Sequence, residues 1–317
     1  MQTTVVVATG GTIAGSAARA DDAVGYTAGV LDAGALLAAV PPLAGLPIEA
    51  ETLARLDSRD MDHATWAALA RRLRALQARP EVGGVVVTHG TDTLEETAYF
   101  LHRTLRADKP VVLTAAMRPA TALSPDGPRN LLDAVTLART PGVRGVVAVL
   151  GGQVLAGGGL RQLHGWRGHP LSAGGARPPA RGGGGIVRVL RDWPRGEALR
   201  EELPDLDPSH WPVVDLVTSH AGARGAVIDA LVAAGAQGIV IAGTGNGSVH
   251  RELREAAARA EAHGVRVWRA SRCLAGGVVG APAGELPSAG TLTPALARVA
   301  LMLELVPRPA PSPSGGR

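Results

Sequence analysis

Short apolar runs alternate with longer helical patterns through the first half of this chain, and this rhythm restricts the fold more than any other feature. Four runs consist almost wholly of valine and other apolar residues, as expected for strands that are buried on both faces. They cover residues 4–8, 85–87, 111–113 and 145–150. Helical patterns lie between them at 33–40, 64–77, 94–104 and 128–138. The alternation predicts an α/β fold, a parallel sheet with helices on both faces.

A smaller αβ pattern begins near residue 213. It predicts strands at 213–217, 238–241 and 265–269 and helices at 223–234, 251–263 and 294–305. At 317 residues the chain exceeds the usual size of a single core, so two domains are expected. The proline-rich stretch before residue 213 is typical of a linker, and the Pro, Ser and Gly residues at the end are typical of disorder. The predicted parts are a domain at 1–202, a linker at 203–212, a domain at 213–306 and a disordered tail at 307–317.

One segment departs from this regular pattern. Thirteen glycines lie between Gly151 and Gly185. Few of the other residues there are large and apolar, so the segment predicts a long mobile loop or a hairpin excursion rather than a packed element.

Composition limits the classes of function. The formal net charge is +4, but basic residues are scattered among acids, and the 3% of aromatic residues offer little for bases to stack on, which disfavours a nucleic-acid partner. No apolar stretch approaches the roughly 18–20 residues of a membrane span. The nine histidines form no metal-binding motif. The chain starts without a recognisable leader, and the lone Cys273 suits a reducing compartment, so we expect a cytoplasmic protein.

Two loops carry the chemistry. The segment Thr9–Ala14, with sequence TGGTIA, follows the first strand directly, and the segment Thr88–Glu96, with sequence THGTDTLEE, follows the second. Each places threonine hydroxyls at the carboxyl end of a buried strand beside glycines, at the edge where open α/β sheets bind ligands. A bare hydroxyl in one loop and Thr91 next to Asp92 in the other suggest acyl transfer on a small polar substrate.

Both loops resemble the signature segments of the bacterial-type L-asparaginase (asparaginase/glutaminase) family. The resemblance implies a larger N-terminal flavodoxin-like doubly wound sheet, a smaller C-terminal α/β domain, and an amidohydrolase that needs no cofactor or metal. It also implies active sites that are completed across a dimer, within a homotetramer. Further matching segments follow the family order at 57–61, 97–101, 116–119, 124–131, 243–247 and 288–292.

The resemblance assigns roles to individual residues. Thr12 would be the nucleophile that attacks the side-chain amide of L-asparagine, and Tyr26 would lie on a mobile lid and help to activate Thr12. Thr91 would belong to a proton relay, while Asp92 would hold the substrate's α-ammonium group. Ser58 would receive the α-carboxylate. Asn246 would reach the active site of a neighbouring subunit, and the other substrate-binding residues would be Gly11, Asp57, Arg59, Gly90 and Ala116.

Four parts of this site have a purely structural alternative. Thr12 could cap the turn that follows it. Asp92 could cap the helix that begins near residue 94, and Ser58 could be a serine of a surface turn. Asn246 could occupy the left-handed position of a Gly-Asn-Gly turn.

The relay departs from the family pattern in one residue. Family members place a lysine where this chain has Gln162, preceded by Arg161, and the only lysine of the chain is Lys109. Glutamine does not titrate and arginine keeps its proton, so neither replaces lysine as a base, and loss of the base predicts a turnover about 10²- to 10⁴-fold lower. In the catalytic site Gln162 could still hold Thr91 by hydrogen bonding. Two hypotheses follow. The chain is a working asparaginase, or it is a catalytically impaired relative that binds an amino acid in the same pocket.

Overall fold

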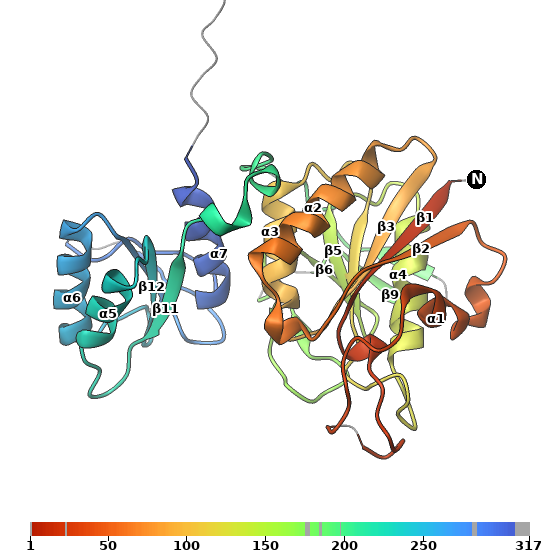
Figure 1. The fold of residues 1–317 in the computed structure, drawn as a ribbon, viewed down its shortest axis with the longest axis horizontal. Coiled ribbons are helices and arrows are strands. Elements are labelled where there is room, and N and C mark those ends of the chain that lie inside the picture. Colours follow the sequence, from red (N-terminus) through yellow and green to blue (C-terminus); the bar gives the residue numbers. More distant parts are fainter. Residues whose placement is uncertain are drawn as a thin grey trace, which may run out of the picture. The chain divides into compact units, whose positions relative to one another are not determined.

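A computed structural model describes residues 2–22, 24–174, 178–183, 186–196, 198–280 and 284–307. The chain divides into two compact units (Figure 1). The first contains the chain up to Ser209 together with Leu274–Gly276, and the second contains the remainder from His210 onward. The division falls within the segment 203–212 that the sequence predicts as a linker. Apart from Pro307, the predicted disordered tail lies outside the described residues.

The first unit is built on a mixed eight-stranded sheet with the order β10-β9-β6-β5-β4-β3-β1-β2. Five neighbouring strands, β2-β1-β3-β4-β5, are parallel, and this is the order of a flavodoxin-like sheet. The predicted fold class is therefore confirmed. The strands are β1 (Thr3–Gly10), β2 (Ile48–Leu56), β3 (Val82–Thr88), β4 (Val111–Thr114), β5 (Val146–Leu150), β6 (Gln153–Ala156), β9 (Ala180–Gly183) and β10 (Ile186–Val189).

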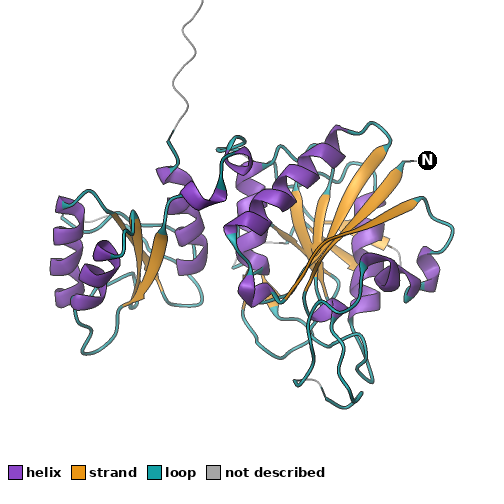
Figure 2. Cartoon of the chain, in the orientation of Figure 1, coloured by secondary structure: helices purple, strands orange, loops and turns teal. Residues whose placement is uncertain are grey.

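Helices cover both faces of this sheet (Figures 1 and 2). Helices α1 (Ala33–Ala38) and α4 (Gly127–Arg139) lie on one face, and α2 (His63–Ala78) and α3 (Leu94–Thr104) lie on the other. The side chains of Asp32 and Asp62 cap α1 and α2 by accepting backbone N–H groups three residues ahead. Short 3-10 turns are η1 (Thr12–Ala14), η2 (Pro41–Leu43), η3 (Ser58–Asp60), η4 (Leu203–Asp205) and η5 (Pro208–His210).

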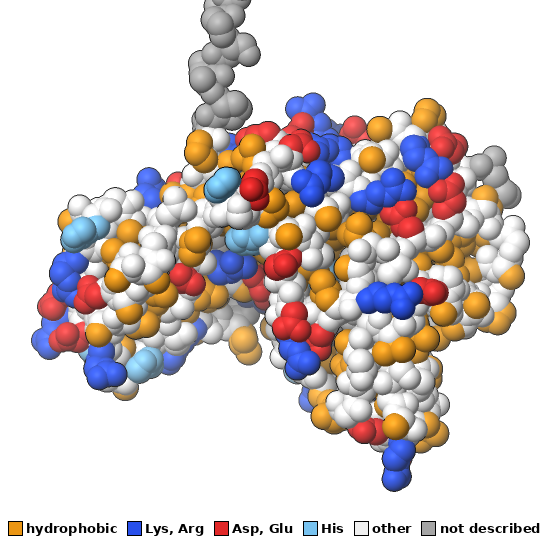
Figure 3. All heavy atoms as spheres, in the orientation of Figure 1, with side chains coloured by type: hydrophobic (Ala, Val, Ile, Leu, Met, Phe, Trp, Pro, Cys, Tyr) orange, Lys and Arg blue, Asp and Glu red, His pale blue; other side chains and the backbone are white. Residues whose placement is uncertain are grey.

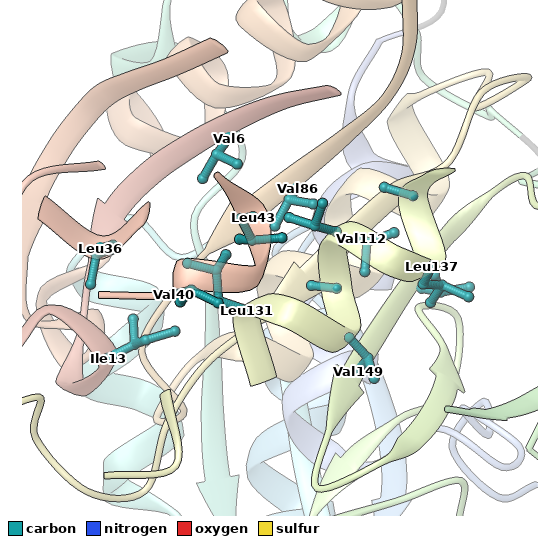
Figure 4. Close-up of a cluster of buried hydrophobic side chains, with 14 of the residues drawn as sticks. Val6, Ile13, Leu36, Val40, Leu43, Val86, Val112, Leu131, Leu137 and Val149 are labelled. Atoms are coloured by element: carbon teal, nitrogen blue, oxygen red, sulfur yellow. The ribbon is translucent and has the colours of Figure 1, made fainter. Parts of the chain in front are cut away.

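A cluster of buried hydrophobic side chains fixes the central strands (Figure 4). Val6, Val86 and Val112 come from the neighbouring strands β1, β3 and β4, and each is fully buried. Leu36 from α1 and Leu131 from α4 pack against the same cluster. Because β-branched residues suit a buried pleated surface, the valine runs specify these strands and hold their carboxyl ends in place.

The described part of the glycine-rich segment 151–185 contains more regular structure than its composition predicts. It contains β6, and β9 and β10 form a hairpin that extends the main sheet beyond β6. Val154 and Leu155 of β6 are buried, so the expectation that this segment lacks packed residues was wrong, while the hairpin is observed. Two further short strands, β7 (Arg161–Gln162) and β8 (Leu171–Ser172), pair with each other.

The second unit is a smaller α/β layer structure. Three parallel strands lie in the order β11 (Val214–Thr218), β12 (Gly238–Gly243) and β13 (Arg266–Ser271). Helices α5 (Ala226–Ala233) and α6 (Arg251–Ala262) pack together on one face, and α7 (Pro294–Leu305) covers the other (Figure 1). The predicted smaller α/β domain is thereby confirmed.

Charged residues of both signs share the surface. On the face that Figure 3 shows, Lys and Arg side chains lie among Asp and Glu side chains in both units. None of the described helices is long and apolar enough to cross a membrane.

Candidate active site

The two threonine loops meet at the carboxyl ends of β1 and β3. In the sheet order β2-β1-β3-β4, β2 lies on one side of β1, whereas β3 and β4 lie on the other side. The direction in which successive strands are added therefore reverses between β1 and β3. Such a switch point leaves a crevice at the sheet edge, because the connections on its two sides leave toward opposite faces. Thr12 follows β1 and Thr91 follows β3, so both hydroxyls belong to this crevice.

Glycines allow these loops to touch. Gly11 has φ +79°, a conformation that favours glycine, and a Cβ atom there would lie 2.3 Å from the backbone nitrogen of Gly90. A Cβ atom on Gly90 would lie 2.4 Å from Oγ of Ser58. Three segments of the chain therefore converge, and any larger residue at these two glycines would separate them.

Thr12 is directed at Tyr26. The Oγ1 atom of Thr12 lies 2.7 Å from the phenolic oxygen of Tyr26, and Thr12 is only 8% exposed. The N-cap residue of η1 is Gly11, with no side-chain cap, so the capping role considered for Thr12 is wrong. Tyr26 lies on a segment that we call the lid, the described residues 15–22 and 24–29.

Ser58 is hydrogen-bonded to the loop that carries Thr91. It is 1% exposed, so the surface-turn alternative is wrong. Its Oγ accepts a hydrogen bond from the backbone N–H of Asp92 (3.2 Å), and its carbonyl accepts one from the hydroxyl of Thr93 (2.7 Å). Thr93 is the N-cap residue of α3, so Asp92 does not cap that helix.

The carboxylate of Asp92 stands in an unfavourable environment. Burial raises its pKa, the negative charge of Asp57 raises it further, and Arg59 lowers it. The side chain of Arg59 is instead paired with Asp57 (3.1 Å). Asp92 forms no ion pair with any described residue. A ligand that brings a positive charge would relieve this repulsion, which makes the pocket suited to an ammonium group.

Two backbone donors of the site loops have no acceptor among the described residues. Within the described part of the chain, the N–H groups of Thr12 and Thr91 donate to no other protein group. Thr91 is 7% exposed, so its N–H lies largely shielded from water. Free N–H groups in such a position can stabilise a developing oxyanion.

Gln162 lies in β7, beside the first turn of α3. Its backbone N–H donates to Oε2 of Glu95 (2.7 Å), and its side-chain nitrogen donates to the carbonyl of His164 (3.1 Å). No hydrogen bond joins it to Thr91 in the part of the chain that the structure describes. Burial raises the pKa of Glu95, whereas the Gln162 N–H and the charge of Arg161 lower it. In the sequence, Glu95 is visible only as one residue of the matching loop. Its hydrogen bond to the Gln162 N–H depends on tertiary packing, which local sequence does not show.

His89 forms a buried network that the sequence does not reveal. Nδ1 lies 2.7 Å from the carbonyl of Gly90, and Nε2 lies 3.0 Å from Oγ1 of Thr97, which also accepts from Nε1 of Trp66 (2.9 Å). Burial lowers the pKa of His89 to about 4, so the ring is neutral at pH 7. Because a carbonyl only accepts, Nδ1 carries the proton, and Nε2 accepts from the Thr97 hydroxyl. The network fixes the loop that carries Thr91.

The remaining predicted residues are distributed as follows. Ala116 is fully buried just beyond β4, at the same edge of the sheet. Asn246 lies in the second unit, where its side-chain amide donates to the carbonyl of Val279 (2.8 Å) and accepts from its N–H (2.7 Å). No described non-glycine residue has a positive φ, so the left-handed alternative for Asn246 is wrong. No three His, Cys, Asp or Glu side chains among the described residues cluster as metal ligands would.

Comparisons with known proteins identify the family of this chain. A family model described as Asparaginase, N-terminal, matches residues 3–195, and one described as Glutaminase/Asparaginase C-terminal domain matches residues 213–307. The chain belongs to the L-asparaginase/glutaminase family. The family resemblance seen in the sequence is confirmed.

Relatives of this asparaginase-family chain match it over nearly all of its length. L-asparaginase 2 of Escherichia coli (strain K12) is 36% identical over 95% of this chain and 88% of its own, and L-asparaginase 2 of Bacillus subtilis (strain 168) is 35% identical over 95% and 81%. A crystal structure titled as a probable cytoplasmic L-asparaginase from Campylobacter jejuni superposes with a TM-score of 0.90 at 35% identity, covering 96% of this chain and 95% of that one. The chain is thus an amidohydrolase of this family, which acts on a linear amide of an amino acid.

Proposed function

We propose that this asparaginase-family chain converts L-asparagine to L-aspartate and ammonia with Thr12 as nucleophile. The observation that carries the proposal is the 2.7 Å contact between Thr12 Oγ1 and the Tyr26 hydroxyl at the switch point of the sheet. A hydroxyl becomes a useful nucleophile when a neighbouring group accepts its proton. Tyr26 is the group in contact with it.

The chemistry proceeds in two balanced steps. Thr12 Oγ bonds to the carboxamide carbon while its proton passes to the Tyr26 oxygen, and Tyr26 passes its own proton to the departing nitrogen, so ammonia leaves. The N–H groups of Thr12 and Thr91 stabilise the oxyanion. Water, oriented by Thr91, then adds to the acyl-threonine, aspartate leaves, and Thr12 regains its proton.

The amino-acid end of the substrate fits the pocket by charge. Asp92, which has no protein counter-ion, pairs with the α-ammonium, while Ser58 and its turn receive the α-carboxylate. Gly11, Gly90, Asp57, Arg59 and Ala116 complete the walls.

Ammonia release from L-asparagine tests the proposal, with Thr12→Ala as the blank. We expect turnover by the native protein above the blank, and a Gln162→Lys variant that is faster by about 10²-fold or more, because lysine restores a titratable relay partner. If native turnover equals that of Thr12→Ala, the proposed activity fails.

One observation favours the second candidate function, an amino-acid-binding protein of low activity. Gln162 replaces the family lysine, and its amide is occupied by the His164 carbonyl. This candidate predicts that L-aspartate or L-asparagine binds in calorimetry without ammonia release, and that only Gln162→Lys acquires turnover. Turnover by the native protein that Thr12→Ala abolishes would exclude it.

Two further proposals concern assembly and location. We propose that Asn246 completes the site of a neighbouring subunit in a homodimer or homotetramer; a monomer in light scattering would contradict this. The cytoplasmic location stays a prediction from Cys273, because one similar protein is titled a probable cytoplasmic L-asparaginase (Campylobacter jejuni) and another a probable periplasmic L-asparaginase (Haemophilus influenzae). Fractionation of cells that produce the protein would test it.

A further inference from the structure

The lid that carries Tyr26 is not held by buried apolar side chains. From Ala18 to Gly25, every described residue except the half-buried Asp22 is exposed, and Val24 is 74% exposed. Segments with few buried contacts open at low free-energy cost. Some other interaction must therefore keep Tyr26 opposite Thr12.

The lid is hydrogen-bonded to the loop of residues 117–124, which we call the support loop and which lies beside it at the carboxyl edge of the sheet (Figure 1). Two of the bonds join backbone to backbone, and the third uses the side chain of Thr121. The bonds are Ala120 N–H to Gly15 O (3.0 Å), Ala17 N–H to Thr121 Oγ1 (2.8 Å) and Leu123 N–H to Ala20 O (3.0 Å).

The support loop is itself anchored. The carboxylate of Asp126 accepts the N–H groups of Met117 (3.0 Å) and Arg118 (2.9 Å). Asn130, which is 2% exposed, donates to Asp126 (3.1 Å) and to the carbonyl of Ala115 (2.9 Å). The loop is thus tied both to α4 and to the end of β4, and it offers the lid a fixed support.

Contacts within the lid connect Ala17 to Tyr26. Ser16 and Thr27 exchange two backbone hydrogen bonds of 2.9 Å each, so the two arms of the lid move together. Thr27 follows Tyr26 directly, and the Tyr26 ring packs so closely on Gly15 that a Cβ atom there would lie 2.8 Å from it. Fixing Ala17 therefore fixes the ring.

We propose that Thr121 is a positioning residue that latches the lid, so that the Tyr26 hydroxyl stays against Thr12. The inference rests on the proposed role of Tyr26 in activating Thr12. No hydrogen bond among the described residues joins Thr121 to Thr12 or Tyr26; its hydroxyl accepts from the Ala17 N–H and reaches the Ala17 carbonyl (3.5 Å). A single exposed bond of this kind is weak enough to break when substrate enters and product leaves.

Thr121→Val tests the latch, because valine keeps the shape and removes the acceptor, whereas Thr121→Ser restores it. Thr136→Val is the matched control, since the Thr136 hydroxyl bonds only to Leu132 O within α4. Amide hydrogen exchange at Ser16 and Thr27 reports on the lid without any substrate. We expect exchange about two- to tenfold faster in Thr121→Val, with kcat lower by a similar factor, and native values in the other two variants.

The outcomes separate the latch from the proposed function. Lid exchange in Thr121→Val equal to that of the native protein overturns the latch, and it does so even if Tyr26→Phe abolishes turnover. Faster lid exchange in Thr121→Val, with unchanged turnover in Tyr26→Phe, supports the latch and overturns the role of Tyr26. Faster exchange in the Thr136→Val control as well would overturn the latch, because the effect would then be general loosening.

Discussion

The lid that faces Thr12 and the loop that carries Thr91 are held in opposite ways. Thr12 faces Tyr26 on an exposed lid that hydrogen bonds secure at the surface. Thr91 follows a strand end whose position is fixed by the fully buried His89 network. The lid therefore belongs to the part of the molecule that opens at low free-energy cost, whereas opening the loop that carries Thr91 would disrupt a buried network and cost more.

This difference separates two tasks of an amidohydrolase. Substrate must enter and ammonia must leave, which requires a side that moves, while the oxyanion and the α-ammonium group need donors and charges that do not shift. Changes on the lid should alter turnover more than stability. Changes in the network beneath Thr91 should alter stability first.

Replacing Tyr26 by phenylalanine should have the largest effect on turnover. Phenylalanine keeps the ring and removes the oxygen that faces Thr12, so we expect kcat to fall about 10²- to 10⁴-fold. The free energy of unfolding in urea should change by only about 1 kcal/mol, the cost of one part-buried hydrogen bond between Thr12 and Tyr26. A stability loss as large as the kinetic loss would contradict the division between the loops.

The buried side should respond to acid. The pKa of His89 is lowered to about 4 from an ordinary 6.5, so its contribution is complete above pH 6.5 and is lost as the pH falls toward 4. The loss amounts to about 3 kcal/mol in the free energy of unfolding. In urea titrations, the free energy of unfolding of the native protein should fall by that amount more than that of His89→Gln as the pH is lowered across this range.

A second measurement keeps this prediction testable if the glutamine variant does not fold. The ¹⁵N chemical shifts of the His89 ring should report a neutral ring with the proton on Nδ1 down to about pH 5. Protonation near pH 6.5 would show that the ring is not buried as described.

Thr97→Val should have a smaller effect than acid. Valine leaves Nε2 of His89 without its donor and Nε1 of Trp66 without its acceptor, at a cost of about 2 kcal/mol. Thr97→Ser keeps the hydroxyl and serves as the control. Amide exchange of the lid should stay at its native rate in both variants. A faster lid would mean that the two loops are coupled.

Sequence patterns predicted the central strands because these strands are buried on both faces. Strand β2 escaped prediction, since it lies at the sheet edge, all its residues are half-buried or exposed, and it contains no apolar run. The strands of the 151–185 segment escaped because Val154 and Leu155 are two large residues among glycines. Family resemblance, not propensity, pointed to the site residues, whose roles stay predictions.

Residues whose roles depend on tertiary partners could not be found from the sequence. His89 matters through its hydrogen bond to Thr97 on α3, which in turn accepts from Trp66 on α2. Local sequence does not show that these three residues lie together. Thr121 acts on a lid more than a hundred positions earlier in the chain. Gln162 is the opposite case, because the absence of a titratable group there is visible from residue type alone.

The central claim is that Thr12 carries the acyl group, and a quenched reaction tests it most directly. Native protein mixed with L-asparagine and quenched in acid during turnover would be digested and analysed by mass spectrometry. We expect an aspartyl ester on the peptide that contains Thr12, and none in Thr12→Ala. An ester on the peptide of Thr91 instead, or ammonia release by Thr12→Ala at the native rate, would contradict the account.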